Sequence, residues 1–210
     1  MILFFKSISN SRKVHEQHQE HEHKLDDTFT SLTVWRKSLV ISCNGFTVID
    51  SNGNLAFRVD NYTGHPEELI LMDGSGKTVL TMCRHKRLGL VDNWRVYEGE
   101  VGEQSSSKKP IFCVRKHKNI LQPNMNVLAR VYDDDGTSGK RCVYVIEGSY
   151  TQRFCRVLDE SRRVVAEIKR KEAMVVGVSF GLEVFLLIVR PEFDPGFAMA
   201  IVLLLDQMFS

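Results

Sequence analysis

From Leu32 to about Arg190 the chain consists of short apolar or alternating runs separated by turn residues. A period of two places every second side chain on one face of a strand, and no long helical pattern interrupts the series. The predicted strands are Leu32–Trp35, Leu39–Cys43, Phe46–Asp50, Leu55–Val59, Leu69–Met72, Thr78–Arg84, Trp94–Glu98, Ile111–Lys116, Val127–Tyr132, Arg141–Ile146, Arg153–Leu158, Val164–Lys169, Met174–Ser179 and Val184–Val189. This succession of strands indicates antiparallel meanders.

Turn residues indicate several hairpins. Residues 50–54 (Asp-Ser-Asn-Gly-Asn) and residues 73–77 (Asp-Gly-Ser-Gly-Lys) each separate two predicted strands. Gly, Asn and Asp tolerate the positive φ that such reversals require. A weaker copy begins at Asp159, which again leads the turn. We therefore expect one hairpin unit to be used repeatedly, without the fixed period of a solenoid.

The C-terminal segment has a different pattern. Asp194 is suited to cap a helix with Pro195 at its first position, and Phe197–Phe209 continues without a helix-breaking residue. Apolar side chains occupy every face of the first turns, so this helix has to be enclosed by protein or lipid. Its length of roughly 20 Å is short of a hydrocarbon core of about 30 Å. Enclosure by protein is therefore predicted, and a membrane anchor is the disfavoured alternative.

The strands and the helix fit one architecture. A helix with its side chains is about 10 to 12 Å across, whereas a barrel of about eight strands is already filled by its own side chains. A wall of about twelve strands is wider, and its closure removes the edge strands that promote aggregation. We therefore predict a mainly β fold, a closed antiparallel β-barrel of about twelve strands around a buried hydrophobic C-terminal helix.

Composition sets further limits. Residues 1–28 are rich in Ser, His, Glu, Gln and Lys and predict a flexible His-rich tail, followed by one domain at residues 29–210. A net charge of +2 is too small for attraction to nucleic acid or anionic membrane as a whole, so such binding requires a local patch.

Five cysteines without a Cys-x-x-Cys pair indicate neither a disulfide framework nor a zinc site. Because no signal-peptide pattern is present, we expect a cytoplasmic protein, either peripheral to the plasma membrane or nucleocytoplasmic.

Several segments resemble the plant LURP-one-related family in their order and spacing. They are residues 32–37 (Leu-Thr-Val-Trp-Arg-Lys), Phe46–Val59 with its Asp-led turn, Leu69–Asp73, residues 84–99 with a basic run before Trp94, Gly148-Ser149-Tyr150, residues 165–171 and residues 200–206. The resemblance implies a tubby-like fold, shared with tubby C-terminal domains and phospholipid scramblases, in which a closed antiparallel barrel surrounds a hydrophobic helix. It also implies an association with plant pathogen defence, and it supplies no catalytic residues.

Basic clusters at or beyond strand ends are the candidate binding residues. The clusters are Arg84, Lys86 and Arg87; Lys169, Arg170 and Lys171; and residues 115–118. Loops from different strands can converge on a barrel, and each cation near an anionic surface contributes about 1 kcal/mol to binding. Tubby domains bind phosphoinositides, so the resemblance favours a headgroup site. The alternative is that these clusters are solvated loops balanced by neighbouring acids.

Neither a catalytic motif nor a metal motif is present. The sequence contains no nucleophile elbow, phosphate-binding glycine loop or zinc-protease helix, and His65, His85 and His117 have no partners nearby in sequence. The histidines of the tail would bind Zn²⁺ or Ni²⁺ if the tail became helical, but a solvated tail is the simpler interpretation. Asp133–Asp135 lack the alternation of a calcium loop and indicate a hairpin turn.

These patterns predict a non-enzymatic protein with no cofactor, no metal and no transmembrane segment. We expect a monomer that binds anionic phospholipid headgroups at a membrane surface or acts as an adaptor with protein partners, and the family resemblance implies a connection with pathogen defence. No nucleic acid partner is expected. The first alternative is a protein-interaction scaffold without lipid binding, and the second is a scramblase-like or hydrolytic activity.

Overall fold

The computed structural model describes residues 29–41, 43–60, 67–85, 93–101, 108–117, 126–133, 141–171 and 181–210. These residues contain twelve strands and one helix, α1 (Pro195–Phe209). The strands are β1 (Thr30–Trp35), β2 (Phe46–Ile49), β3 (Leu55–Val59), β4 (Glu68–Asp73), β5 (Thr78–Arg84), β6 (Asn93–Glu98), β7 (Phe112–Lys116), β8 (Val127–Asp133), β9 (Cys142–Ser149), β10 (Phe154–Leu158), β11 (Val164–Arg170) and β12 (Val184–Val189). The predicted tail at residues 1–28 and the predicted strand Met174–Ser179 lie outside the described residues.

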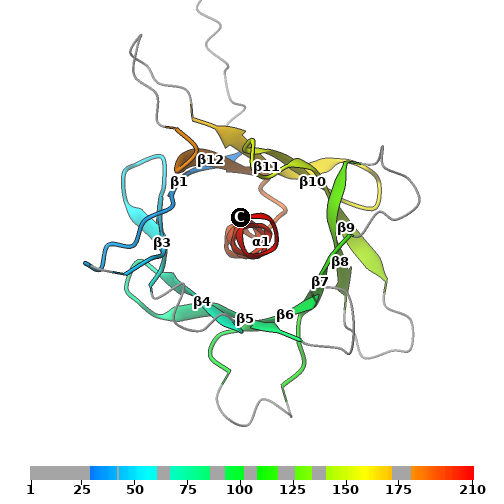
Figure 1. Cartoon of the computed structure of the whole chain (residues 1–210), viewed down its shortest axis with the longest axis horizontal. Coiled ribbons are helices and arrows are strands. Elements are labelled where there is room, and N and C mark those ends of the chain that lie inside the picture. Colours follow the sequence, from blue (N-terminus) through cyan, green and yellow to red (C-terminus); the bar gives the residue numbers. More distant parts are fainter. Residues whose placement is uncertain are drawn as a thin grey trace, which may run out of the picture.

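The strands form one closed antiparallel barrel (Figure 1). Each strand pairs with its neighbours in sequence, and β1 pairs with both β2 and β12, so none of these twelve strands has a free edge. Along β1 the side chains of Leu32 and Val34 are buried, whereas those between and beside them are more exposed. The alternation seen in the sequence is therefore the alternation between the inside and the outside of the wall.

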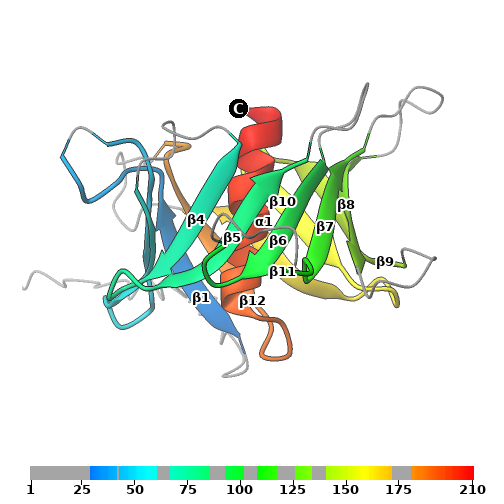
Figure 2. The same cartoon turned by 90° about the horizontal axis from the view of Figure 1, so that it is seen from below.

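Helix α1 runs through the barrel (Figures 1 and 2). Asp194 caps it by accepting a hydrogen bond from the Phe197 N–H at 2.6 Å, and Pro195 is its first residue. Every residue from Gly196 to Asp206 is buried. The ring of Phe112 on β7 stacks on Phe197 with 4.2 Å between centroids, so the wall contacts the helix directly. The predicted fold, a closed β-barrel around a buried C-terminal helix, is confirmed.

Three hairpin turns share one set of backbone hydrogen bonds. In each, the N–H of an aspartate donates to the carbonyl four residues later, and the N–H three residues later donates back to the aspartate carbonyl. The turns are residues 50–54, 73–77 and 159–163. The fourth position requires a positive φ, which Gly53 and Gly76 supply and which Arg162 also adopts, at +63°. The predicted reuse of one hairpin unit is thus observed.

One predicted strand is wrong. The predicted strand Leu39–Cys43 falls in the connection between β1 and β2, and its described residues, 39–41 and 43, form no strand. Because β1 pairs with β12 on one side and β2 on the other, the wall has no place for an additional strand between them. The apolar side chains of this connection therefore stay outside the core, and Ile41 is 92% exposed.

The course of the chain gives the barrel two distinct rims. Only residues 190–194 separate β12 from α1, so the helix begins where β12 ends. Since neighbouring strands are antiparallel, every odd-numbered strand ends at the opposite rim, beside the C-terminus of α1 (Figure 2). We call this the upper rim, and the other the lower rim. Lys116 at the end of β7 donates to the Met208 carbonyl, in agreement with this assignment.

Candidate anion-binding rim and pocket

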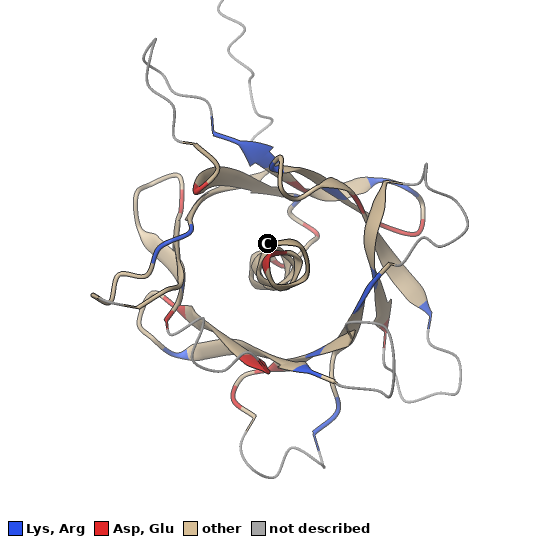
Figure 3. Cartoon of the chain, viewed as in Figure 1, with Lys and Arg blue, Asp and Glu red and all other residues tan. Residues whose placement is uncertain are grey.

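Basic side chains end four of the odd-numbered strands at the upper rim. They are Arg36 and Lys37 just after β1, Arg84 on β5, Arg115 and Lys116 on β7, and Lys169, Arg170 and Lys171 on or just after β11. The described residues of the basic clusters noted in the sequence therefore share one end of the barrel, whereas Lys118 of the third cluster lies outside the described residues. Figure 3 shows Lys and Arg at separate strand ends around the wall.

The structure does not join the predicted binding residues in one small site. Arg84 ends β5 and Lys169 lies on β11, and these strands are six places apart in the closed order of twelve, on opposite sides of the barrel. Lys86 and Arg87 lie outside the described residues. A single headgroup therefore cannot contact both described clusters, whereas a flat anionic surface across the rim can.

Each basic residue of the β11 cluster has a local partner. Lys169 forms an ion pair with Glu167, with 2.6 Å between Nζ and Oε2. The Arg170 Nε donates to the Gln152 carbonyl at 2.9 Å, and the Lys171 Nζ donates to Thr33 Oγ1 at 2.9 Å. The Lys169–Glu167 ion pair lies at the surface, where such pairs contribute little, so an external anion can replace Glu167 at low cost.

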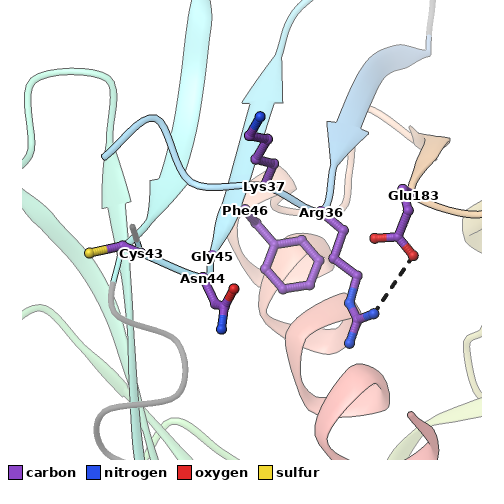
Figure 4. A pocket seen from close by; sticks show the side chains of 7 residues that line it. All are labelled: Arg36, Lys37, Cys43, Asn44, Gly45, Phe46 and Glu183. Carbon is purple, nitrogen blue, oxygen red and sulfur yellow. Dashed lines mark ion pairs between the residues drawn. The ribbon is translucent and has the colours of Figure 1, made fainter. Parts of the chain in front are cut away.

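A pocket of about 380 Å³ opens between the β1–β2 connection and the start of β12 (Figure 4). Its lining includes Arg36, Lys37, Asn44, Phe46 and Glu183. The Arg36 side chain extends toward Glu183, whereas Lys37 points the other way (Figure 4). The volume falls within the range of small-ligand sites, about 300 to 1,000 Å³. Charged and amide groups at its mouth suit a polar headgroup better than an apolar ligand.

A buried polar network lies behind the pocket. Arg36 binds the Asp206 carboxylate of α1, and that carboxylate also accepts hydrogen bonds from the Tyr150 hydroxyl at 3.0 Å and the Ser210 hydroxyl at 2.8 Å. Burial, together with the charge of Asp206, raises the pKa of Tyr150 well above its ordinary value, so the phenol stays protonated. Burial alone lowers the pKa of Arg36, but the charges of Asp206 and Glu183 outweigh it and raise that pKa.

These network residues were not singled out by the sequence. Arg36 and Asp206 are 170 positions apart, so no local pattern pairs them. One signal was available, because Asp206 is the only charged residue in α1 and a charge inside an apolar helix requires a partner. Identifying Arg36 as that partner required the closed wall.

Two of the described cysteines have thiols with raised pKa values. Burial first, and then the charge of Glu68, raises the pKa of Cys83 to about 11. Burial raises the pKa of Cys155 to about 12. Neither thiol therefore forms much thiolate, the reactive species, near neutral pH. No group of three His, Cys, Asp or Glu side chains suited to a metal ion occurs in the part of the chain that the structure describes. Within that same part, no helix has the length and apolar character needed to cross a bilayer.

Comparisons with known proteins agree with this architecture. The model of the LURP-one-related family matches residues 30–206. Protein LURP-one-related 17 of Arabidopsis thaliana is 52% identical over 187 residues, which cover 86% of this chain and 84% of that protein. Protein LURP-one-related 8 of the same plant is 48% identical over 181 residues, covering 85% and 86%. An X-ray structure of a protein from Arabidopsis thaliana, 26% identical, aligns with a TM-score of 0.59 over 85% of this chain and 90% of that one. The chain therefore belongs to the LURP-one-related family.

Proposed function

We propose that this chain is a non-enzymatic LURP-one-related protein that attaches to anionic phospholipid surfaces, phosphoinositides among them, through its upper rim. In this proposal it serves as a peripheral adaptor in pathogen defence. The observation that carries it is the position of Arg36, Lys37, Arg84 and Lys169–Lys171, which reach one rim from separate strands. A membrane presents many anionic headgroups in one plane, so each cation around the rim can contact a different headgroup.

The lower rim supports the same orientation. It carries the turns of Asp50 and Asp73, whose carboxylates accept backbone hydrogen bonds, whereas Asp159 of the third turn is paired with Arg163 at 2.8 Å. An anionic surface repels these carboxylates and attracts the upper rim, so the molecule is turned before contact. The protein therefore approaches an anionic membrane with its upper rim first.

Vesicle sedimentation with charge-reversal variants tests the proposal. Wild-type protein is expected to bind phosphatidylcholine vesicles that contain phosphatidylserine or a phosphoinositide, and to bind them more weakly as salt is raised. In Lys169→Glu/Lys171→Glu, two lost cations remove about 2 kcal/mol, so binding weakens about 30-fold or more. Lys109→Glu is the matched control for the single reversal Lys169→Glu, because this exposed lysine precedes β7 at the lower rim and both reversals change the net charge equally.

Two results would contradict lipid binding. One is equal sedimentation with neutral phosphatidylcholine vesicles. The other is an equal loss of binding in the upper-rim and lower-rim variants, which would mean that overall charge, and not the rim, decides attachment. No vesicle binding by the wild type would favour the protein-interaction scaffold.

A further inference from the structure

Exposed apolar side chains are concentrated at the upper rim. Seven large apolar residues of the described part of the chain are exposed, and only Ile111, next to β7, lies at the lower rim. The other six are Trp35, Leu39, Val40, Ile41, Phe154 and Leu182. They belong to β1, the β1–β2 connection, β10 and the residues before β12, which lie in one sector of the wall together with β11. The apolar residues and the β11 cations therefore share one side of one rim.

Three of these residues form the tip of the β1–β2 connection. Leu39 is 53% exposed, Val40 41% and Ile41 92%. A run of three exposed aliphatic residues is costly in water and marks a surface that is covered by a partner. Because the closed wall offers no edge for strand addition, that partner has to receive the side chains themselves.

Both ends of the connection are held in place. The buried Ser38 hydroxyl donates to Asp60 at 2.8 Å and accepts from the Val40 N–H at 3.0 Å. Thr47 Oγ1 donates to the Lys37 carbonyl at 2.7 Å. At Gly45 an added Cβ would lie 1.9 Å from the Val59 carbonyl oxygen, so the chain passes tightly against β3. The tip is thus a preformed projection whose ordering cost is met on folding.

Cations flank the projection. Lys37 lies over the Trp35 ring with 5.3 Å between its Nζ and the ring centroid, and Arg36 enters the pocket next to it. An indole at the base of an apolar projection, with cations beside it, matches the layers of an anionic bilayer, which are acyl chains, interface and headgroups.

We infer that the β1–β2 connection is a membrane-insertion loop for an anionic phospholipid bilayer. Leu39, Val40 and Ile41 enter the boundary between headgroups and acyl chains. Trp35 lies at the interface, and Lys37 with the β11 cations holds the headgroups. This inference rests on the proposed lipid-binding function. It adds which part of the chain enters the membrane and how deeply, namely to the boundary between headgroups and acyl chains.

Polar replacement at the tip tests the insertion. Leu39→Asn/Ile41→Asn should weaken partitioning onto phosphatidylcholine–phosphatidylserine vesicles at least about tenfold, because two aliphatic side chains no longer leave water. Ile111→Asn, a matched change at the lower rim, should stay within about twofold. All three side chains are exposed, so thermal unfolding of both variants should match that of the wild type.

Acyl-chain contact has its own readout. Trp35 is exposed and Trp94 is buried in the core, so lipids brominated on their acyl chains should quench Trp35 emission on binding. Trp35→Phe should abolish the quenching, and Leu39→Asn/Ile41→Asn should reduce it at equal bound protein. Wild-type binding that persists in part at about 1 M salt is also expected, since insertion is not screened.

The outcomes separate the two claims. If the wild type binds anionic vesicles with salt sensitivity, but the tip variant binds equally and no quenching occurs, insertion is refuted and surface attachment stands. If the wild type binds no vesicle of either composition, both claims fail together.

Discussion

The guanidinium of Arg36, one residue beyond β1, binds the carboxylate of Asp206 on the central helix through two contacts, Nε to Oδ1 and Nη2 to Oδ2, each 3.2 Å long. This paired geometry joins the first strand of the wall to the last turn of the helix. The Asp206 side chain is 1% exposed, whereas that of Arg36 is 34% exposed and faces the pocket. The pocket and the core are therefore connected by one side chain.

Removing this cation should destabilise the barrel. Arg36→Ala leaves the Asp206 carboxylate buried without its counter-charge. Breaking a fully buried ion pair costs about 3 to 5 kcal/mol, and because Arg36 is partly exposed we expect the free energy of unfolding to fall by about 2 to 4 kcal/mol. Urea denaturation measures this change. Arg141→Ala, which removes a cation paired with Glu160 on the surface, should lower the free energy of unfolding much less, because an exposed ion pair is screened by solvent. Equal losses in the two variants would show that the Arg36 contact has no special weight.

The helix fills the barrel, so shortening its side chains should create cavities. Leu203 is fully buried, and Leu203→Ala is expected to lower the free energy of unfolding by about 3 to 5 kcal/mol. Gln207→Ala, at a partly exposed position of the same helix, should stay within about 0.5 kcal/mol. Deletion of residues 195–210 is expected to give insoluble protein without β-sheet signal in circular dichroism. A soluble, folded truncation would contradict the role of the helix as core.

Two glycines with positive φ should differ sharply in their tolerance of alanine. Gly148 has φ +119°, and an added Cβ would lie 2.1 Å from the Phe154 carbonyl oxygen. Gly53 has φ +85° and open space around it. We expect Gly53→Ala to cost about 1 kcal/mol of unfolding free energy and Gly148→Ala at least about 3 kcal/mol. Chemical denaturation of both variants decides this, and comparable costs would mean that the wall yields at Gly148.

The Asp-led turns should make stability depend on acid pH. The N–H of Asn54 holds the pKa of Asp50 below its ordinary value, and the hydroxyl of Ser75 does the same for Asp73. Because the folded-state pKa is the lower one, this stabilisation is complete above the unfolded-state pKa of about 4 and is lost as the pH falls through the folded-state values.

Urea midpoints measured against pH test this dependence. Asp50→Asn/Asp73→Asn keeps the turn-forming side-chain oxygen but does not titrate, so its midpoint should fall less steeply in acid than that of the wild type. Glu192→Gln, which changes an exposed acid outside the two Asp-led turns, is the control, and its curve should stay closer to that of the wild type than to that of the double variant. Parallel curves for all three proteins would assign the acid sensitivity to other carboxyl groups.

Sequence patterns predicted most of the wall and the whole helix. Val184–Val189 and Leu55–Val59 are apolar or alternating runs bounded by turn residues, and both form strands with the predicted bounds. Asp194 and Pro195 predicted the start of α1 because capping is a local interaction. The failure at Leu39–Cys43 has an equally clear cause, since a short apolar run contains no information about whether a neighbouring strand is free to pair.

By itself, the sequence determined the strand series, the repeated Asp-led turn and an apolar helix that has to be enclosed, because these depend on side-chain period, turn chemistry and capping within a few residues. Tertiary structure alone decided the Arg36–Asp206 contact, the shared rim of Arg84 and Lys169, and the outward projection of Ile41. All three follow from closure of the wall, which joins β1 to β12 and so sets how residues far apart in the chain face one another.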